Sequence, residues 1–163
     1  MSKELIDKII THDEHNIKGL FYEYRPLSNV HLCDIWYEGL KYPSNENAYQ
    51  ASKLHPSLRE EFTTMTPIQA MKAGRERHLD SDKEDWLLKR VDVMYAVNFE
   101  KFKNLELRNL LLATGDKYLE ETNWWGDQFW GFYNGEGSNM LGKVLMTLRS
   151  NLREIEILKN IWE

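Results

Sequence analysis

Cysteine is almost absent from this chain of 163 residues, in which Cys33 is the single example. No disulfide can therefore form within the chain, and no cluster of thiolates can hold a metal. His12 and His15 lie close together in a polar segment, where we expect no metal site. One thiol and no disulfide are typical of a reducing compartment, so we expect a cytoplasmic protein.

Long apolar runs and an excess of basic residues are also missing. No apolar stretch approaches the ~20 residues of a membrane span, and the N-terminal sequence M-S-K-E-L-I-D-K-I-I lacks the apolar core of a signal peptide. The net charge is −5, with acids and bases interspersed. This balance argues against a protein that binds nucleic acid mainly through basic residues on its phosphates. It leaves open a pocket for one nucleotide or one modified base, and we expect no membrane partner.

The common catalytic motifs do not occur. There is no G-x-x-x-x-G-K-[ST] phosphate loop, no G-x-G-x-x-G, no G-x-S-x-G and no H-E-x-x-H. Cys33 and His31 are two residues apart, but a cysteine nucleophile also needs a third group that orients its base. These absences leave few reaction classes to consider.

Hydrophobic residues make up 42% of the chain, which is enough for the core of a globular protein. Helical periodicity dominates. Extended segments are expected mainly in the N-terminal third, with a strand in 21–32, a second over 34–38, and 40–42 pairing back after a turn at Gly39. A further brief extended piece is expected at 118–121. The sequence therefore predicts one α+β, predominantly α-helical domain over residues 1–163, with a small antiparallel sheet from the N-terminal region.

The segment 42–53, Y-P-S-N-E-N-A-Y-Q-A-S-K, is the most informative part of the chain. Pro43 ends an extended segment, and the next polar residues can cap a helix. Glu46, Gln50 and Lys53 are spaced i, i+4 and i+7, so they share one helical face. Such a stripe can bind a polar ligand or can simply face water, and the pattern alone favours the solvated face.

Two further sets of residues have a structural and a functional interpretation. Arg25, Ser28 and Asn29 lie in a turn between extended pieces, where turn chemistry alone explains a Ser-Asn pair. Trp86 lies early in a long helix, where a tryptophan is more often part of the core than a stacking platform.

The segment 124–137 has six aromatic residues and four glycines among fourteen. Such a loop either fills a core or lines a ligand site. Trp125, Gly126 and Asp127 with Asn139 form the polar set of this region. Asp127 beside a glycine can also serve only an Asx turn.

Carboxylates with aromatic walls suit cleavage of a glycosidic bond. Its transition state resembles an oxocarbenium ion. A nearby carboxylate can stabilise this ion or can activate the water molecule that attacks it. A tryptophan can stack on a leaving base, worth ~1–3 kcal/mol. Glu46, Asp127 and Trp86 have this chemistry.

Eight segments in order resemble the YbiA-like family, also called NADAR, over about residues 21–152. They are L-S-N (27–29), Y-P-S-x-E-x-A-Y-Q-A-x-K (42–53), R-E-E (59–61), D-W-x-x-K-x-x-x-V-M (85–94), K-F (101–102), L-R-x-L-L-L-A-T-G-D (107–116), W-W-G-D (124–127) and N-M-L-G-K-x-L-M-x-L-R (139–149).

The resemblance implies an N-glycosidase that hydrolyses the bond between a nitrogen and C1 of a ribose. Its substrate would be ADP-ribose on guanine bases or a phosphoribosylated pyrimidine intermediate of riboflavin synthesis. The family's essential positions fall on Glu46, Trp86 and Asp127. Positions that line the pocket fall on Asn29, Gln50, Lys53, Trp125 and Asn139, beside Arg25, Ser28 and Gly126. The family resemblance implies no metal or redox cofactor, and we expect no stable protein partner.

This sequence departs from the family pattern at Asn47, where histidine is frequent, at Val30, and in the unusually aromatic loop after W-G-D. These departures concern the substrate more than the reaction. Two alternatives stay open: a module that binds ADP-ribose or a nucleotide without cleaving it, and a scaffold with an apolar interior beneath Trp125 and Trp130.

Overall fold

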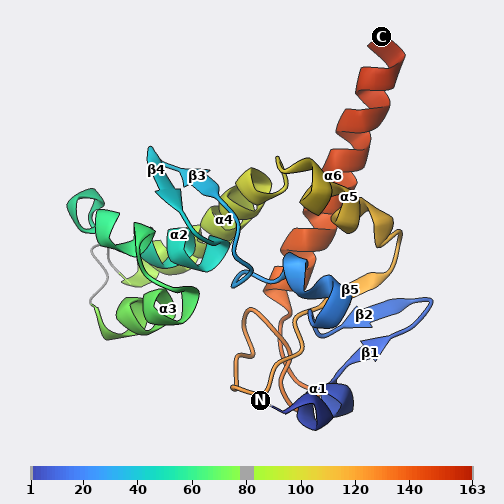
Figure 1. The fold of residues 1–163 in the computed structure, drawn as a ribbon, viewed down its shortest axis with the longest axis horizontal. Coiled ribbons are helices and arrows are strands. Elements are labelled where there is room, and N and C mark those ends of the chain that lie inside the picture. The colour runs from blue at the N-terminus through green and yellow to red at the C-terminus, as the bar shows by residue number, and fades with distance from the viewer. Residues whose placement is uncertain (1, 78–82, 163) are drawn as a thin grey trace. The chain divides into compact units, whose positions relative to one another are not determined.

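The structure, a computed structural model, describes residues 2–77 and 83–162. The chain divides into two compact units. Unit 1 contains the N-terminal segment up to Ser28 and the chain from Leu105 onward, whereas unit 2 spans Asn29–Asn104 (Figure 1).

Unit 2 is built around a short helix, α2. In chain order its elements are β3 (Ile35–Tyr37), β4 (Leu40–Tyr42), α2 (Asn45–Ala51), the 3-10 helices η2 (Pro56–Leu58) and η3 (Glu60–Thr63), α3 (Pro67–Glu76) and α4 (Lys83–Lys101). Strands β3 and β4 form an antiparallel hairpin. Helices α3 and α4, η3 and the hairpin all contact α2. Every residue of α2 is buried as a result.

The hairpin turn is fixed by Glu38 and Gly39, which both have positive φ, 47° and 82°. Two consecutive residues with positive φ match the two-residue turn that follows the natural twist of paired strands. The turn sets Ile35 opposite Tyr42, and both side chains are buried.

Unit 1 combines a small mixed sheet with the long C-terminal helix. Its elements are α1 (Lys3–Ile9), β1 (Thr11–His12), β2 (Asn16–Lys18), the 3-10 helix η1 (Tyr22–Leu27), α5 (Leu105–Ala113), β5 (Tyr118–Glu120) and α6 (Met140–Trp162). The strand order is β1-β2-β5, antiparallel between β1 and β2 and parallel between β2 and β5. The face of α6 formed by Leu141, Leu145, Leu148 and Leu152 is buried, and α6 contacts β5 and α5.

The predicted class, α+β with helix dominant, is confirmed, as is the pairing of 35–37 with 40–42. The strand predicted within 21–32 is wrong, because Tyr22–Leu27 form a 3-10 helix that contains Pro26. A proline fixes φ near −65°, which suits a tight turn of helix as well as an extended segment. The three-stranded sheet was not predicted. Within the described residues, no helix has the length and apolar character needed to cross a membrane.

Candidate functional site

The start of α2 is held by hydrogen bonds from two directions. Ser44 caps the helix, since its Oγ accepts from the N–H of Asn47 at 3.2 Å. The N–H of Glu46, in the first turn, donates to the carbonyl of Asn29 at 3.0 Å. First-turn N–H groups have no partner within a helix, so these bonds fix where the helix begins. The L-S-N turn therefore positions Glu46.

The polar stripe of α2 is buried rather than solvated. Glu46 is 8% exposed and Gln50 is 5% exposed. Gln50 Nε2 donates to Glu46 Oε1 at 2.7 Å, and Gln50 Oε1 has no hydrogen-bond partner among the described residues. The solvated interpretation of these two residues is thus wrong. An acid and an amide removed from water one turn apart form the polar centre of unit 2.

Trp86 and Tyr49 form an aromatic wall beside this centre. Their ring centroids are 5.4 Å apart with planes tilted by 52°. Lys53 Nζ lies 5.2 Å from the Tyr49 centroid and 6.0 Å from the Trp86 centroid, which is cation–π distance. Trp86 is buried at the start of α4. Glu46, Gln50, Lys53 and Trp86 therefore belong to one cluster around α2.

Burial lowers the pKa of the Lys53 ammonium, and the nearby Glu46 carboxylate acts in the opposite direction. Desolvation disfavours a charged group, whereas an opposite charge favours it. Within the cluster, Lys53 thus loses part of its preference for the protonated form.

Three buried asparagines support the same helix. Asn45 Nδ2 donates to Asn98 Oδ1 at 2.8 Å and lies 3.3 Å from Asn29 Oδ1. Asn98 Nδ2 donates to the carbonyl of Met94 at 3.0 Å. Asn29 was predicted to line the pocket. In the structure its carbonyl and side chain form hydrogen bonds with α2 and α4.

Several of these contacts were missed from the sequence. Asn47, at the position where histidine is frequent, donates through Nδ2 to the carbonyls of Phe62 and Met65. Tyr49, Asn45 and Asn98 were not singled out. The i, i+3 spacing of Glu46 and Tyr49 was the available signal for Tyr49.

In unit 1, the side chain of Asp127 closes an Asx turn. Its Oδ1 accepts from the N–H groups of Phe129 at 3.0 Å and Trp130 at 2.8 Å. Buried Asn123 holds the same loop, donating to the Asp127 carbonyl at 2.7 Å and accepting from its N–H at 3.1 Å. The structural interpretation of Asp127 is therefore correct, and a catalytic role would have to coexist with this turn.

Asn139 is also engaged by its own unit. Its Oδ1 accepts from the N–H of Glu121, and its Nδ2 donates to the Leu119 carbonyl and the Tyr118 hydroxyl. It therefore joins the start of α6 to strand β5. Both N–H groups of its amide are used within unit 1, where its side chain acts as a structural bridge.

The remaining predicted residues of unit 1 differ in exposure. Trp125 is 44% exposed and packs edge-on against Trp124. Gly126, with φ +84°, and Arg25 are exposed, whereas Ser28 is buried. Convergence of these residues with the α2 cluster remains a prediction.

A hollow of about 590 Å³ in unit 1 is lined by residues 14–16 and 113–118, which include none of the predicted site residues. Among the described residues, no three His, Cys, Asp or Glu side chains gather as they would around a metal ion.

The sequence matches the model of the NADAR domain family over residues 11–153. The chain belongs to the NADAR family. The N-glycosidase YbiA of Escherichia coli is 36% identical over 135 residues, covering 80% of this chain and 82% of that protein. The NMR structure of E. coli YbiA superposes with a TM-score of 0.77 at 32% identity, covering 91% of both chains.

Two other relatives extend the comparison. A riboflavin biosynthesis protein of Vibrio vulnificus is 38% identical over 132 residues, which cover 78% of this chain but only 35% of the Vibrio protein. The N-glycosidase Npun_R5314 of Nostoc punctiforme is 31% identical over 149 residues, covering 89% of this chain and 92% of that protein. Family membership and these relatives support an N-glycosidase-type function, so the predicted class, a hydrolase of N-glycosyl bonds, is confirmed.

Proposed function

We propose that this NADAR protein hydrolyses the bond between a nucleobase-type nitrogen and C1 of a ribose, with the α2 cluster at its centre. The observation that carries the proposal is the buried Glu46, hydrogen-bonded to Gln50 in a unit that also places Lys53 over the rings of Tyr49 and Trp86. A buried carboxylate with aromatic walls matches the needs of an oxocarbenium-like transition state.

In the proposed reaction, the nitrogen–C1 bond breaks and the electron pair leaves with the nitrogen, which takes up a proton. The oxygen of a water molecule bonds to C1 and releases a proton. Glu46 stabilises the positive charge that develops on the ribose, or accepts the proton of the attacking water. Trp86 stacks on the base or the ribose. Asp127 orients ribose hydroxyls or the base through the part of its carboxylate that the Asx turn leaves available.

Gln50 has a supporting role in this mechanism. Its Nε2 donates to one oxygen of Glu46, which fixes the rotamer of the carboxylate. Asn29, through its carbonyl, fixes the turn of helix that carries Glu46.

Two substrate classes fit the proposal: ADP-ribose attached to guanine in DNA or RNA, and phosphoribosylated pyrimidines of riboflavin synthesis. The second class is supported by the name of the Vibrio relative, of which this chain spans about a third. Arg25, Ser28, Trp125, Gly126 and Asn139 are proposed to contribute to substrate binding. We also propose that the protein works in the cytoplasm.

The test is a paired hydrolysis assay. Purified protein is incubated separately with DNA carrying ADP-ribosylated guanine and with the phosphoribosylated pyrimidine, and the released ribosyl product is measured by chromatography. We expect release from one of them by the wild-type protein and none by Glu46→Gln, a nearly isosteric change that removes only the charge.

Circular dichroism of Glu46→Gln controls for folding. Hydrolysis by a folded Glu46→Gln protein at the wild-type rate would refute the assignment of Glu46. Saturable binding of either substrate by the wild-type protein without any release would instead support the alternative, a module that reads the ribosyl group. The scaffold alternative predicted an apolar interior beneath the aromatic loop, whereas buried Asn123 and the Asp127 carboxylate hold that loop.

A further inference from the structure

The last turns of α6 extend beyond the contacts that hold the rest of this helix. Leu152 is buried, and Arg153 donates to Asp116 Oδ1 at 2.7 Å. From residue 154 to residue 161 no side chain is buried. Figure 1 shows these red turns reaching past α5 and the three-stranded sheet of the same unit. About two turns of helix therefore lack a packing partner among the described residues of unit 1.

The exposed turns carry four large apolar side chains, of which Ile155 and Leu158 lie one turn apart on the same face. Ile155, Ile157, Leu158 and Ile161 are 38%, 58%, 54% and 67% exposed. Isolated helices of this length are marginal in water, because helical stability comes mainly from packing of an apolar face. An amphipathic segment with no packing partner among the described residues of unit 1 indicates an interface.

The spacing of the segment follows a heptad. With Ile155 at position a, Leu158 falls at d, Glu154 at g and Lys159 at e. Isoleucine at a with leucine at d favours two parallel strands, and residues g and e of neighbouring helices form ion pairs across such a dimer. We propose that α6 residues 154–162 pair in parallel with the same segment of a second copy of this chain, setting Glu154 of each copy beside Lys159 of the other.

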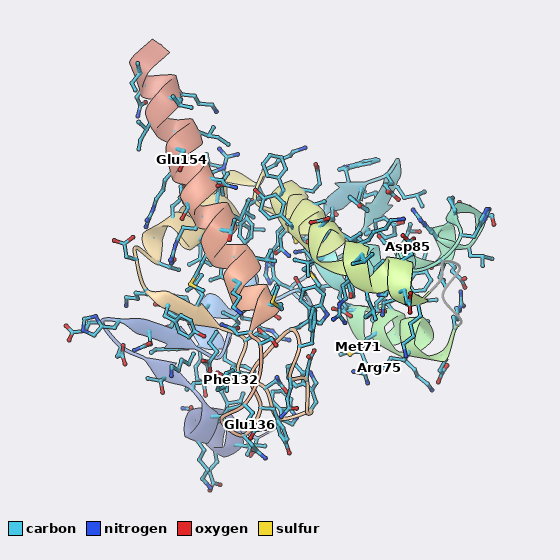
Figure 2. The ribbon with its side chains drawn as sticks, turned by 180° about the vertical axis from the view of Figure 1, so that it is seen from behind. Met71, Arg75, Asp85, Phe132, Glu136 and Glu154 are labelled. Atoms are coloured by element: carbon cyan, nitrogen blue, oxygen red, sulfur yellow. The ribbon has the colours of Figure 1, made fainter. Side chains whose placement is uncertain are left out.

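The charges support a second copy as the occupant. Neither Glu154 nor Lys159 forms an ion pair or hydrogen bond within residues 2–77 and 83–162, although other charged residues of the chain do. Figure 2 shows Glu154 on the part of α6 that leads into the free turns. In a parallel pair, a residue at position g of one helix faces position e of the partner helix, five residues further along the sequence. Residues 154 and 159 have this separation. The segment is thus complementary to itself in charge.

The proposed pairing begins only where the side chains of α6 cease to be buried within unit 1. Leu148 precedes Ile155 by one heptad at position a, but it is fully buried within the chain. The free seam is therefore little longer than one heptad, which predicts a weak, concentration-dependent dimer rather than an obligate one. This proposal replaces the expectation of no stable protein partner, and it does not depend on the proposed hydrolysis.

The test is sedimentation velocity of the full chain over a range of concentrations from micromolar to millimolar. We expect a monomer–dimer equilibrium for the wild type. Leu158→Glu places a charge in the seam and should leave only monomer. Ile157→Ser, at position c outside the seam, is the matched control and should dimerise as the wild type does.

Charge exchange separates pairing with a second copy from other uses of this face. Glu154→Lys and Lys159→Glu should each weaken the dimer by roughly tenfold, because a two-fold dimer contains the pair twice. The double variant Glu154→Lys/Lys159→Glu should restore the wild-type dissociation constant. Circular dichroism checks that each variant stays folded.

A wild-type protein that is monomeric at every concentration would overturn the proposal, even if it bound lipid vesicles or another protein through this face. Loss of the dimer in Ile157→Ser to the same extent as in Leu158→Glu would overturn the heptad assignment. Failure of the double variant to recover would overturn the parallel register.

Discussion

Gln50 Nε2 donates to Glu46 Oε1 at 2.7 Å, and this bond turns the other end of the same amide toward Gly74. A Cβ built on Gly74 would lie 2.0 Å from Gln50 Oε1. Glycine at position 74, inside α3, therefore leaves the space in which the amide can face the carboxylate.

Replacing Gly74 by alanine should displace the Gln50 amide from Glu46. The clashing atom is the end of a flexible side chain, and alanine gains up to ~1 kcal/mol of helix propensity. We therefore expect stability within about 1 kcal/mol of the wild type. Hydrolysis should nevertheless fall at least as far as in Gln50→Ala. The measurements are urea denaturation and initial hydrolysis rates.

The matched control is Gly74→Ala in a Gln50→Ala background. With the amide removed, the nearest remaining atom is the residue-50 Cβ, 3.1 Å away. Gly74→Ala should then have little further effect on the rate and should stabilise α3. Additive losses of rate in the double variant would show that Gly74 acts on something other than Gln50.

Lys53 should respond directly to the charge of Glu46. Burial lowers the pKa of this ammonium and the Glu46 carboxylate raises it. Glu46→Gln removes the second effect, so the pKa of Lys53 should fall further. The pKa is measured from the pH dependence of the ¹³Cε chemical shift of labelled lysine, with exposed Lys159 as internal control. An unchanged or raised pKa of Lys53 would contradict the proximity of the two charges.

The same shift gives a sign for the pH dependence of stability. The folded protein loses the Lys53 proton at lower pH than the unfolded chain, whose pKa lies near the ordinary value of 10.5. Between those two pKa values the unfolded state binds more protons, so the free energy of unfolding contributed by Lys53 rises with pH. Lys53→Met should flatten this rise in urea denaturation measured at several alkaline pH values. A slope equal to that of the wild type would contradict it.

Asn98 should matter for stability more than any exposed asparagine. Asn98→Ala leaves Asn45 Nδ2 without its 2.8 Å acceptor in a buried site. A buried polar group that loses its partner costs about 1–3 kcal/mol. Asn109→Ala, on the exposed face of α5, is the control and should stay within about 0.5 kcal/mol of the wild type. Equal effects of the two variants in urea denaturation would show that the buried amides are not a stabilising cluster.

Local signals in the sequence predicted the α2 region well. Pro43, the Ser44 cap and the spacing of Glu46 and Gln50 place a helix with a polar stripe, and the structure has it. The strand β2 was missed because it has only three residues, of which Ile17 alone is buried. Its partner β5 lies about a hundred residues away. No local period can reveal a pairing of that kind.

The burial of the site residues could not be predicted from sequence periodicity. A helix with glutamate, glutamine and lysine on one face is normally solvated, and only the packing of α3, α4 and η3 around α2 removes it from water. The resemblance to the family corrected this interpretation for Glu46. It also marked Asn29, Asp127 and Asn139, whose side chains hold turns together in the structure.

At Asp127 in unit 1, substitutions can distinguish a structural role of the carboxylate from a catalytic one. Its Oδ1 accepts from two N–H groups, and an asparagine at this position keeps a carbonyl oxygen for both. Asp127→Asn should therefore retain the turn and stay within about 0.5 kcal/mol of wild-type stability. Asp127→Ala loses both bonds and should cost about 1–3 kcal/mol.

If Asp127 orients the substrate through its charge, Asp127→Asn should reduce hydrolysis strongly in spite of its stable fold. The hydrolysis rate of both variants is compared with their free energy of unfolding from urea denaturation. Full activity in Asp127→Asn, with a loss only in Asp127→Ala, would show that the carboxylate serves the Asx turn alone. The catalytic charge would then lie with Glu46, because the turn needs only an acceptor oxygen at position 127, whereas stabilising an oxocarbenium-like ribose needs a carboxylate.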